Sequence, residues 1–171
     1  MRNRRKLTIV LATAASLLAG PAMAMCLDNS ERQAITTRVL QTELMVAALT
    51  CGQQGEFNTF ARKFEGELVS QGKLLRAAFQ RNYGGQGEPR LNAFVTRLAN
   101  EASQRSISGR AEFCPRSAGL FDVVLNTPPA ALSSLAEQQP FSSAHGVSEC
   151  SKEVASQAPA AKTSPVKAKP R

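Results

Sequence analysis

The sequence predicts an all-α fold: a small up-and-down bundle of about four helices, pinned by two disulfides and followed by a disordered C-terminal tail. Three observations lead to this prediction. Apolar residues recur at steps of three, four and seven, the spacing of one helix face. Glycine and proline clusters separate these stretches at short intervals. The chain of 171 residues has four cysteines, and an even number is typical of exported disulfide-bonded proteins.

Residues 1–24 have the pattern of a cleaved secretory signal peptide. Four basic residues open this segment, and an apolar run too short to span a bilayer comfortably follows. Ala22 and Ala24 are the small residues that signal peptidase reads. We therefore expect a periplasmic or secreted protein whose mature chain begins at Met25.

The first predicted helix begins at Asn29 or Ser30 and runs to about Thr50. Either residue can cap the helix, since both side chains accept hydrogen bonds from the first turn. Asp28 and Glu31 lie where the helix dipole favours negative charge. The apolar stripe of this helix is broad, as expected of a helix that is well buried in a bundle.

A second helix is predicted from near Asn58 to Tyr83, after Gly52 and Gly55 break the chain. Its apolar residues recur on one face: Phe57, Phe60, Phe64, Leu68, Leu75, Phe79 and Tyr83. This face is interpreted as core, because an exported monomer cannot leave so large an apolar surface in water. A ligand groove or a partner-binding face is the alternative interpretation.

A glycine-rich stretch at residues 84–89 separates the second helix from the third. It resembles a phosphate-binding loop, but a helix precedes it where such a loop needs a strand. The third helix is expected at about Arg90 to Ser106, with Pro89 opening it at the first helical position, which tolerates proline. Arg105 falls on the polar face of this helix, which is interpreted as solvated.

A fourth helical segment is expected to begin at Cys114 and to stop at Pro128. A short turn of helix at residues 130–138 completes the predicted domain, which spans residues 25–138. Residues 139–171 are rich in Ala, Pro, Ser and Lys and lose helical periodicity toward their end. We therefore predict a flexible tail there.

Helix geometry restricts the pairing of the four cysteines. An unbroken first helix separates Cys26 from Cys51 by about 35 Å, far beyond the reach of a disulfide. In an up-and-down bundle, Cys51 and Cys114 finish at the same end. We therefore predict a Cys51–Cys114 disulfide and, by subtraction, a Cys26–Cys150 disulfide that anchors the start of the tail.

The formal charge of +8 lies mostly at the two ends of the chain. Residues 25–140 hold 12 basic and 11 acidic residues, so the predicted domain is almost neutral. This distribution argues against a nucleic-acid partner, which would need a basic surface on the domain itself. The basic tail is expected to make at most weak contact with anionic membrane or wall polymer.

The sequence predicts no catalytic site, no metal and no cofactor. The cysteines form no CxxC or CxxCH motif, and the single histidine, His145, lies where we expect little order. Glu65 and Glu67 are the closest pair of acids on the second helix, but a spacing of two turns them about 200° apart. Glu43 and Asp122 are isolated acids beside apolar positions, where a buried functional group or the edge of a buried face is expected.

The function that these features favour is that of a non-catalytic protein-interaction module of the cell envelope, with another envelope protein as its partner. An immunity or inhibitor protein, or a periplasmic chaperone that exposes its Phe-rich face, is an alternative. A carboxylate-based hydrolase that acts on the cell wall is a further one. The oligomeric state is left open.

Export and oxidation make a prediction that mass spectrometry checks. Protein recovered from the cell envelope should have the mass of a chain that begins at Met25. An Ala24→Phe variant should accumulate as the longer, uncleaved precursor, because signal peptidase needs a small residue at position 24. A non-reducing digest should join Cys26 to Cys150. Recovery of uncleaved wild-type chain, or a peptide that joins Cys26 to Cys51, would contradict these expectations.

Overall fold

The computed structural model describes residue 25 and residues 27–147, and this part of the chain is helical and contains no strand. The α-helices, in chain order, are α1 (Asn29–Cys51), α2 (Gln54–Lys63), α3 (Glu65–Tyr83), α4 (Gly87–Ser108), α5 (Arg110–Asn126) and α6 (Leu132–Glu137). The short 3₁₀ turns are η1 (Gly84–Gln86), η2 (Pro129–Ala131) and η3 (Ser142–His145). The all-α prediction is confirmed.

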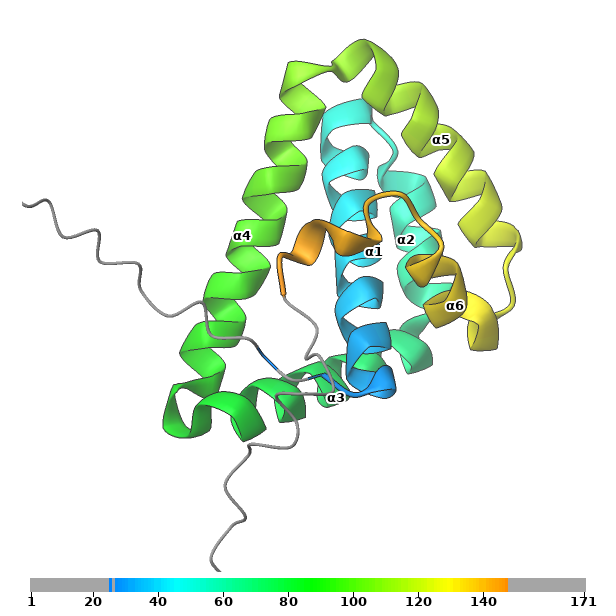
Figure 1. The fold of residues 1–171 in the computed structure, drawn as a ribbon. Helices are drawn as coiled ribbons and strands as arrows, with labels where there is room; N and C mark the ends of the chain where they lie inside the picture. Colours follow the sequence, from blue (N-terminus) through cyan, green and yellow to red (C-terminus); the bar gives the residue numbers. More distant parts are fainter. Residues whose placement is uncertain (1–24, 26, 148–171) are drawn as a thin grey trace, which may run out of the picture.

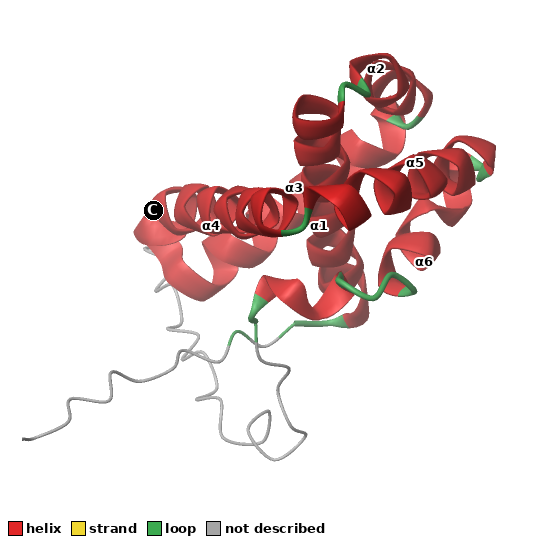
Figure 2. Ribbon diagram, turned by 90° about the horizontal axis from the view of Figure 1, so that it is seen from above, coloured by secondary structure: helices red, strands yellow, loops and turns green. Residues whose placement is uncertain are grey.

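The central element is α1, against which α3, α4, α5 and α6 all pack. In Figure 1, α4 and α5 form an inverted V around α1 and meet beyond its C-terminal end. Figure 2 shows the same two helices from above, following one another across the molecule. The third helix, α3, runs across the N-terminal half of α1, so the order is not the simple up-and-down bundle that was predicted.

The predicted single helix from Asn58 to Tyr83 is wrong, because the chain breaks at Phe64. The backbone there leaves helical angles, with φ of −106° and ψ of 14°. Phe64 is fully buried in a core cluster with α5, whereas Leu75 and Phe79 belong to a second cluster with α4. One straight helix does not reach both clusters, and the break lets each half follow its own neighbours.

The core is therefore divided into two clusters that share α1. The first surrounds Leu40 and Leu44 and receives side chains from α2, α5 and α6. The second surrounds Ile35 and Val39 and receives side chains from α3 and α4. The Phe-rich face of the predicted second helix is thus divided between the two clusters. Four of its residues are buried, and Phe57, Leu68 and Tyr83 are partly buried at the edges of the clusters.

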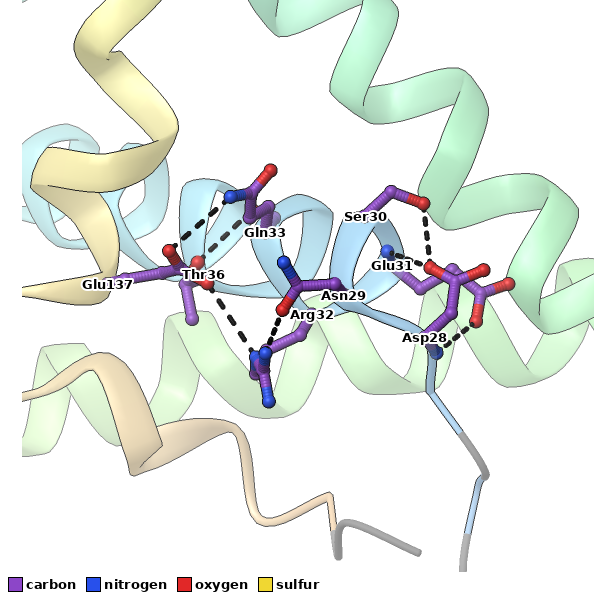
Figure 3. Close-up of polar contacts among 8 residues, drawn as sticks. All are labelled: Asp28, Asn29, Ser30, Glu31, Arg32, Gln33, Thr36 and Glu137. Atoms are coloured by element: carbon purple, nitrogen blue, oxygen red, sulfur yellow. Dashed lines mark hydrogen bonds and ion pairs between the residues drawn. The ribbon is translucent and has the colours of Figure 1, made fainter. Parts of the chain in front are cut away.

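A capping box starts α1, and its cap is Asp28 rather than Asn29 or Ser30. The Asp28 carboxylate accepts hydrogen bonds from the Glu31 backbone N–H at 2.9 Å and from the Ser30 hydroxyl at 2.7 Å. In return, the Glu31 carboxylate accepts from the Asp28 backbone N–H at 3.0 Å. Figure 3 shows this reciprocal arrangement. Two of the N–H groups that a helix start leaves without partners are thereby satisfied.

The same end of α1 is held to two other helices by charge. Glu31 is only 5% exposed, and its two oxygens accept from the Arg81 guanidinium of α3 at 2.5 Å and 2.7 Å. On the other side, Arg32 and Gln33 contact the Glu137 carboxylate of α6 (Figure 3). A buried carboxylate is tolerated because charged and backbone donors replace its water.

The predicted third and fourth helices correspond to α4 and α5, and both begin earlier than predicted. Pro89 lies inside the first turn of α4, which starts at Gly87. Pro115 lies within α5, which starts at Arg110. Pro115 removes the N–H that would bond the Ala111 carbonyl, but Ala111 is exposed, so water can satisfy that carbonyl.

The packed part of the chain extends beyond Gln138, where the predicted domain ends. Phe141 packs against both core clusters. His145 is buried rather than mobile: its Nδ1 accepts from the Val147 backbone N–H at 3.0 Å, and its carbonyl accepts from Arg97 at 2.8 Å. Phe141 and His145 thus pack against the helices.

A disulfide joins Cys51 at the end of α1 to Cys114 in α5, with 5.5 Å between the Cα atoms. This is the pairing that helix geometry predicts. The predicted Cys26–Cys150 bond, the signal peptide and the remainder of the tail lie outside the described residues. A disulfide of this kind typically contributes about 2–4 kcal/mol to folding stability.

The two ends of the described chain meet between α3 and α4. Met25 and Val147 line one cavity of about 350 Å³. Cys26 directly follows Met25, and Cys150 is three residues beyond Val147, a reach of about 10 Å for extended chain. This arrangement favours the Cys26–Cys150 pairing, which stays a prediction.

The capping box predicts a specific sensitivity to acid. Hydrogen bonds from the Ser30 hydroxyl and the Glu31 N–H lower the pKa of Asp28 below its ordinary value. A carboxyl with a lowered folded-state pKa adds stability above its ordinary pKa, and this stability is lost as pH falls through the folded-state value. Asp28→Asn should therefore lower the free energy of unfolding at pH 7, and the difference from wild type should shrink below about pH 4.

Urea unfolding between pH 7 and pH 3 measures this difference. Asp122→Asn is the matched control, because the exposed Asp122 carboxylate makes no hydrogen bond with the described residues. It should change the unfolding free energy little at any pH. A gap between Asp28→Asn and wild type that does not vary with pH would contradict the assignment of Asp28 as the ionised cap.

Candidate functional site

A cavity of about 220 Å³ lies between α5 and the segment at residues 139–141, with α1 and α4 behind it. Apolar side chains form most of its wall: Leu44, Ala47, Phe113, Leu120, Pro140 and Phe141. Each comes from an element that the core already holds in place. The cavity is therefore a feature of the packed domain.

A second compartment of about 280 Å³ adjoins the first along α5. The two compartments share Arg116, Leu120, Pro140 and Phe141 in their walls, and the second adds Gly119 and Val123. They therefore form one groove, which we call the α5 groove. From residue 113 to residue 123 it follows α5 for about 15 Å, since a helix rises 1.5 Å per residue.

Both walls of the α5 groove are anchored by the fold. Cys114 ties the start of α5 to the end of α1, one residue from the groove-lining Phe113. On the opposite wall, the half-buried Phe141 packs on both core clusters and positions Pro140. A groove with walls held in this way is largely formed before any partner arrives.

A buried ion pair stands in the wall of the first compartment. Glu43 of α1 is 6% exposed, and its Oε1 accepts a hydrogen bond from Nη2 of Arg105 of α4. The Arg105 side chain keeps 39% of its surface exposed. The pair joins α1 to α4, and Arg105 compensates the desolvation of the Glu43 carboxylate.

Arg116 stands where the two compartments join, and its side chain is exposed. The guanidinium carbon lies 5.9 Å from the ring centroid of Phe113, within the range of a cation–π contact. Arg116 forms no ion pair with any of the described residues. The side chains lining the groove therefore carry two positive charges, from Arg105 and Arg116, against the single negative charge of Glu43.

The groove offers apolar surface and charge, and no paired nucleophile and base. Its one hydroxyl, that of Ser117, is buried and donates to the Phe113 backbone carbonyl at 2.8 Å. Within residues 27–147 and residue 25, no three His, Cys, Asp or Glu side chains gather closely enough to hold a metal ion. The arrangement is suited to holding a ligand by packing and charge.

The acidic residues considered in the sequence analysis lie in different surroundings. Glu43 is brought into the α5 groove, whereas Asp122 is exposed and lines no part of it. Glu67 accepts hydrogen bonds from Gln71 at 2.7 Å and from Ser133 at 3.0 Å, whereas Glu65 is exposed.

Arg105 and Arg116 are the groove residues that the sequence did not single out. Arg105 does lie on an exposed face, with 39% of its side chain exposed, but it also pairs with the buried carboxylate of Glu43, which the sequence did not predict. An isolated Glu43 among apolar residues signals that some cation must come near it, but the sequence does not say which one. Only the approach of α4 to α1 selects Arg105.

No protein-family model, curated protein or solved structure matches this chain. The described helices also include none with both the length and the apolar character needed to cross a membrane.

The buried pair predicts a measurable difference between two ion pairs that both involve α4. Glu43→Gln should lower the free energy of unfolding by about 1–2 kcal/mol, because the buried side chain at residue 43 loses a charge-assisted hydrogen bond, while the partly exposed Arg105 keeps access to water. Glu101→Gln is the control, since its pair with Arg97 spans 3.5 Å with both side chains at least 40% exposed. Urea denaturation should give that variant a loss within about 0.5 kcal/mol. Equal losses for the two variants would show that burial gives the Glu43 pair no special weight.

Proposed function

We propose that this chain is an exported, non-catalytic protein-interaction module of the cell envelope, and that the α5 groove is its recognition surface. The observation that carries the proposal is an apolar groove that the packed domain leaves open along about 15 Å of α5. A surface of this kind between rigid elements is a common site for a partner segment.

The shape of the groove supports a protein partner. It is divided into two apolar compartments, of about 220 and 280 Å³, that adjoin along α5. Each suits one large apolar side chain. Two such pockets in line match a partner that inserts two side chains from one segment.

Export is supported by two independent features. The first 24 residues have the charge and hydropathy pattern of a secretory signal. The Cys51–Cys114 disulfide is of the kind that persists in oxidising compartments such as the periplasm. An immunity or inhibitor protein is one specific form of this proposal, because it would use such a groove to hold its target.

The other candidates receive less support from the geometry. A carboxylate-based hydrolase needs two carboxyl groups that face one substrate, but the α5 groove contains only Glu43, which Arg105 engages. A chaperone that exposes its Phe-rich face would have to open the core, since Phe60 and Phe64 are 0% exposed and Phe79 is 4% exposed.

Site-specific photo-crosslinking in living cells tests the proposal. A photo-reactive amino acid replaces Val123, which lines the α5 groove, or Val69 on α3, which lines neither compartment of the groove. The two valines are a matched pair, because each is 52% exposed. The Val123 probe should capture one envelope protein as a discrete adduct, and the Val69 probe should not.

Two results would count against the proposal. Equal capture at Val123 and Val69 would indicate non-specific encounters. The absence of any protein adduct at Val123, in a cell whose protein is exported and folded, would remove the α5 groove as a protein-recognition surface.

A further inference from the structure

The charges around the α5 groove restrict what can bind there. Arg116 lines both compartments, whereas Glu43 is already engaged by Arg105. A lysine of the partner at the junction would be repelled by the guanidinium of Arg116, which forms no ion pair with a carboxylate among the described residues. A partner's carboxylate there can accept two parallel hydrogen bonds from one guanidinium.

The position of Arg116 prepares it for this role. Its guanidinium lies over the ring of Phe113, which also lines the groove. A guanidinium presents several donors in one plane, so less motion is lost when it grips a carboxylate.

The shape of the α5 groove indicates the form of the partner. Its two compartments share Leu120 in their walls, and the groove runs alongside a helix. On a helical partner, side chains four residues apart lie about 5–6 Å from each other and point the same way. Gly119 widens the second compartment, since a Cβ placed there would meet nothing within 4 Å.

We infer that the α5 groove receives an amphipathic helix of the partner protein, with two apolar side chains one turn apart in the compartments and a carboxylate on Arg116. This inference rests on the proposed function and specifies the chemistry of the partner. It follows from the two joined apolar compartments, their length along α5 and the one guanidinium at their junction that has no ion pair among the described residues.

The experiment begins with the Val123 photo-crosslink. Mass spectrometry identifies the partner segment joined to residue 123, and that segment, synthesised with a fluorescent label, is the probe for anisotropy titrations with the purified full-length mature protein. The segment should contain an Asp or Glu within one turn of two apolar residues at i and i+4. Its affinity should fall as salt is raised, because a charge pair contributes to binding.

Charge variants of α5 test the role of Arg116. Arg116→Gln should weaken binding of the labelled segment about tenfold, which is the effect of losing one charge-assisted contact. Arg116→Lys should restore part of the loss, because it keeps the charge but not the planar fork. Arg110→Gln is the matched control: Arg110 is also an exposed arginine of α5 but does not line the groove, so this change should alter affinity less than about twofold.

Gly119 supplies a second test that does not threaten folding. Gly119→Leu should fill the open second compartment and weaken binding about tenfold or more, while the helix itself gains from a better helix former. Gly119→Ala gives a similar gain in helix propensity without filling the space, so it should bind nearly as well as wild type. Circular dichroism and urea unfolding confirm that both variants are folded.

The possible outcomes distinguish failure of the acidic-helix inference from failure of the interaction-module proposal. A protein captured at Val123 whose segment lacks a carboxylate, or whose affinity is unchanged by Arg116→Gln, overturns the acidic-helix inference and leaves the interaction module standing. An adduct with the mass of a lipid at Val123, or no adduct, overturns both. Undiminished binding by Gly119→Leu also overturns the inference, because the second compartment would then be unused.

Discussion

The structure depends on the burial of one helix on several sides. Helix α1 presents Ile35 and Val39 to one core cluster and Leu40 and Leu44 to the other, so almost every other element must pack against it. More than one face of this helix is apolar, so no single face determines which helices pack against it. The positions of α3, α4, α5 and α6 therefore follow from which part of α1 each one covers, and the α5 groove is space that these helices leave between them.

Burial on this scale brings two carboxylates of α1 out of water, and arginines from other helices compensate both. Glu31 is held by Arg81 of α3 and by the capping box, and Glu43 is held by Arg105 of α4. The two pairs differ in their surroundings. The first closes a helix start, whereas the second stands in the wall of a groove. The same physical requirement, that a buried charge must have a partner, thus shapes both the frame and the candidate site.

Sequence reasoning succeeded where local chemistry decides. The periodic apolar residues predict helices because the helical repeat is a local property, and the length of the first helix was enough to exclude a Cys26–Cys51 bond and favour Cys51–Cys114. It failed at Phe64, where the chain bends so that one apolar stripe can serve two clusters. Nothing in the spacing of the phenylalanines marks that break, since its cause is the position of α5 and α4.

By itself, the sequence determined the helical class, the Cys51–Cys114 pairing and the absence of familiar catalytic motifs, because these depend on composition and on short-range periodicity. The tertiary structure alone decided the α5 groove. Glu43 and Arg105 are 62 residues apart, and the opposing wall at Phe141 comes from a segment that the sequence assigned to the tail. Contacts between residues so distant in the chain are set by how helices pack, which local preferences do not specify.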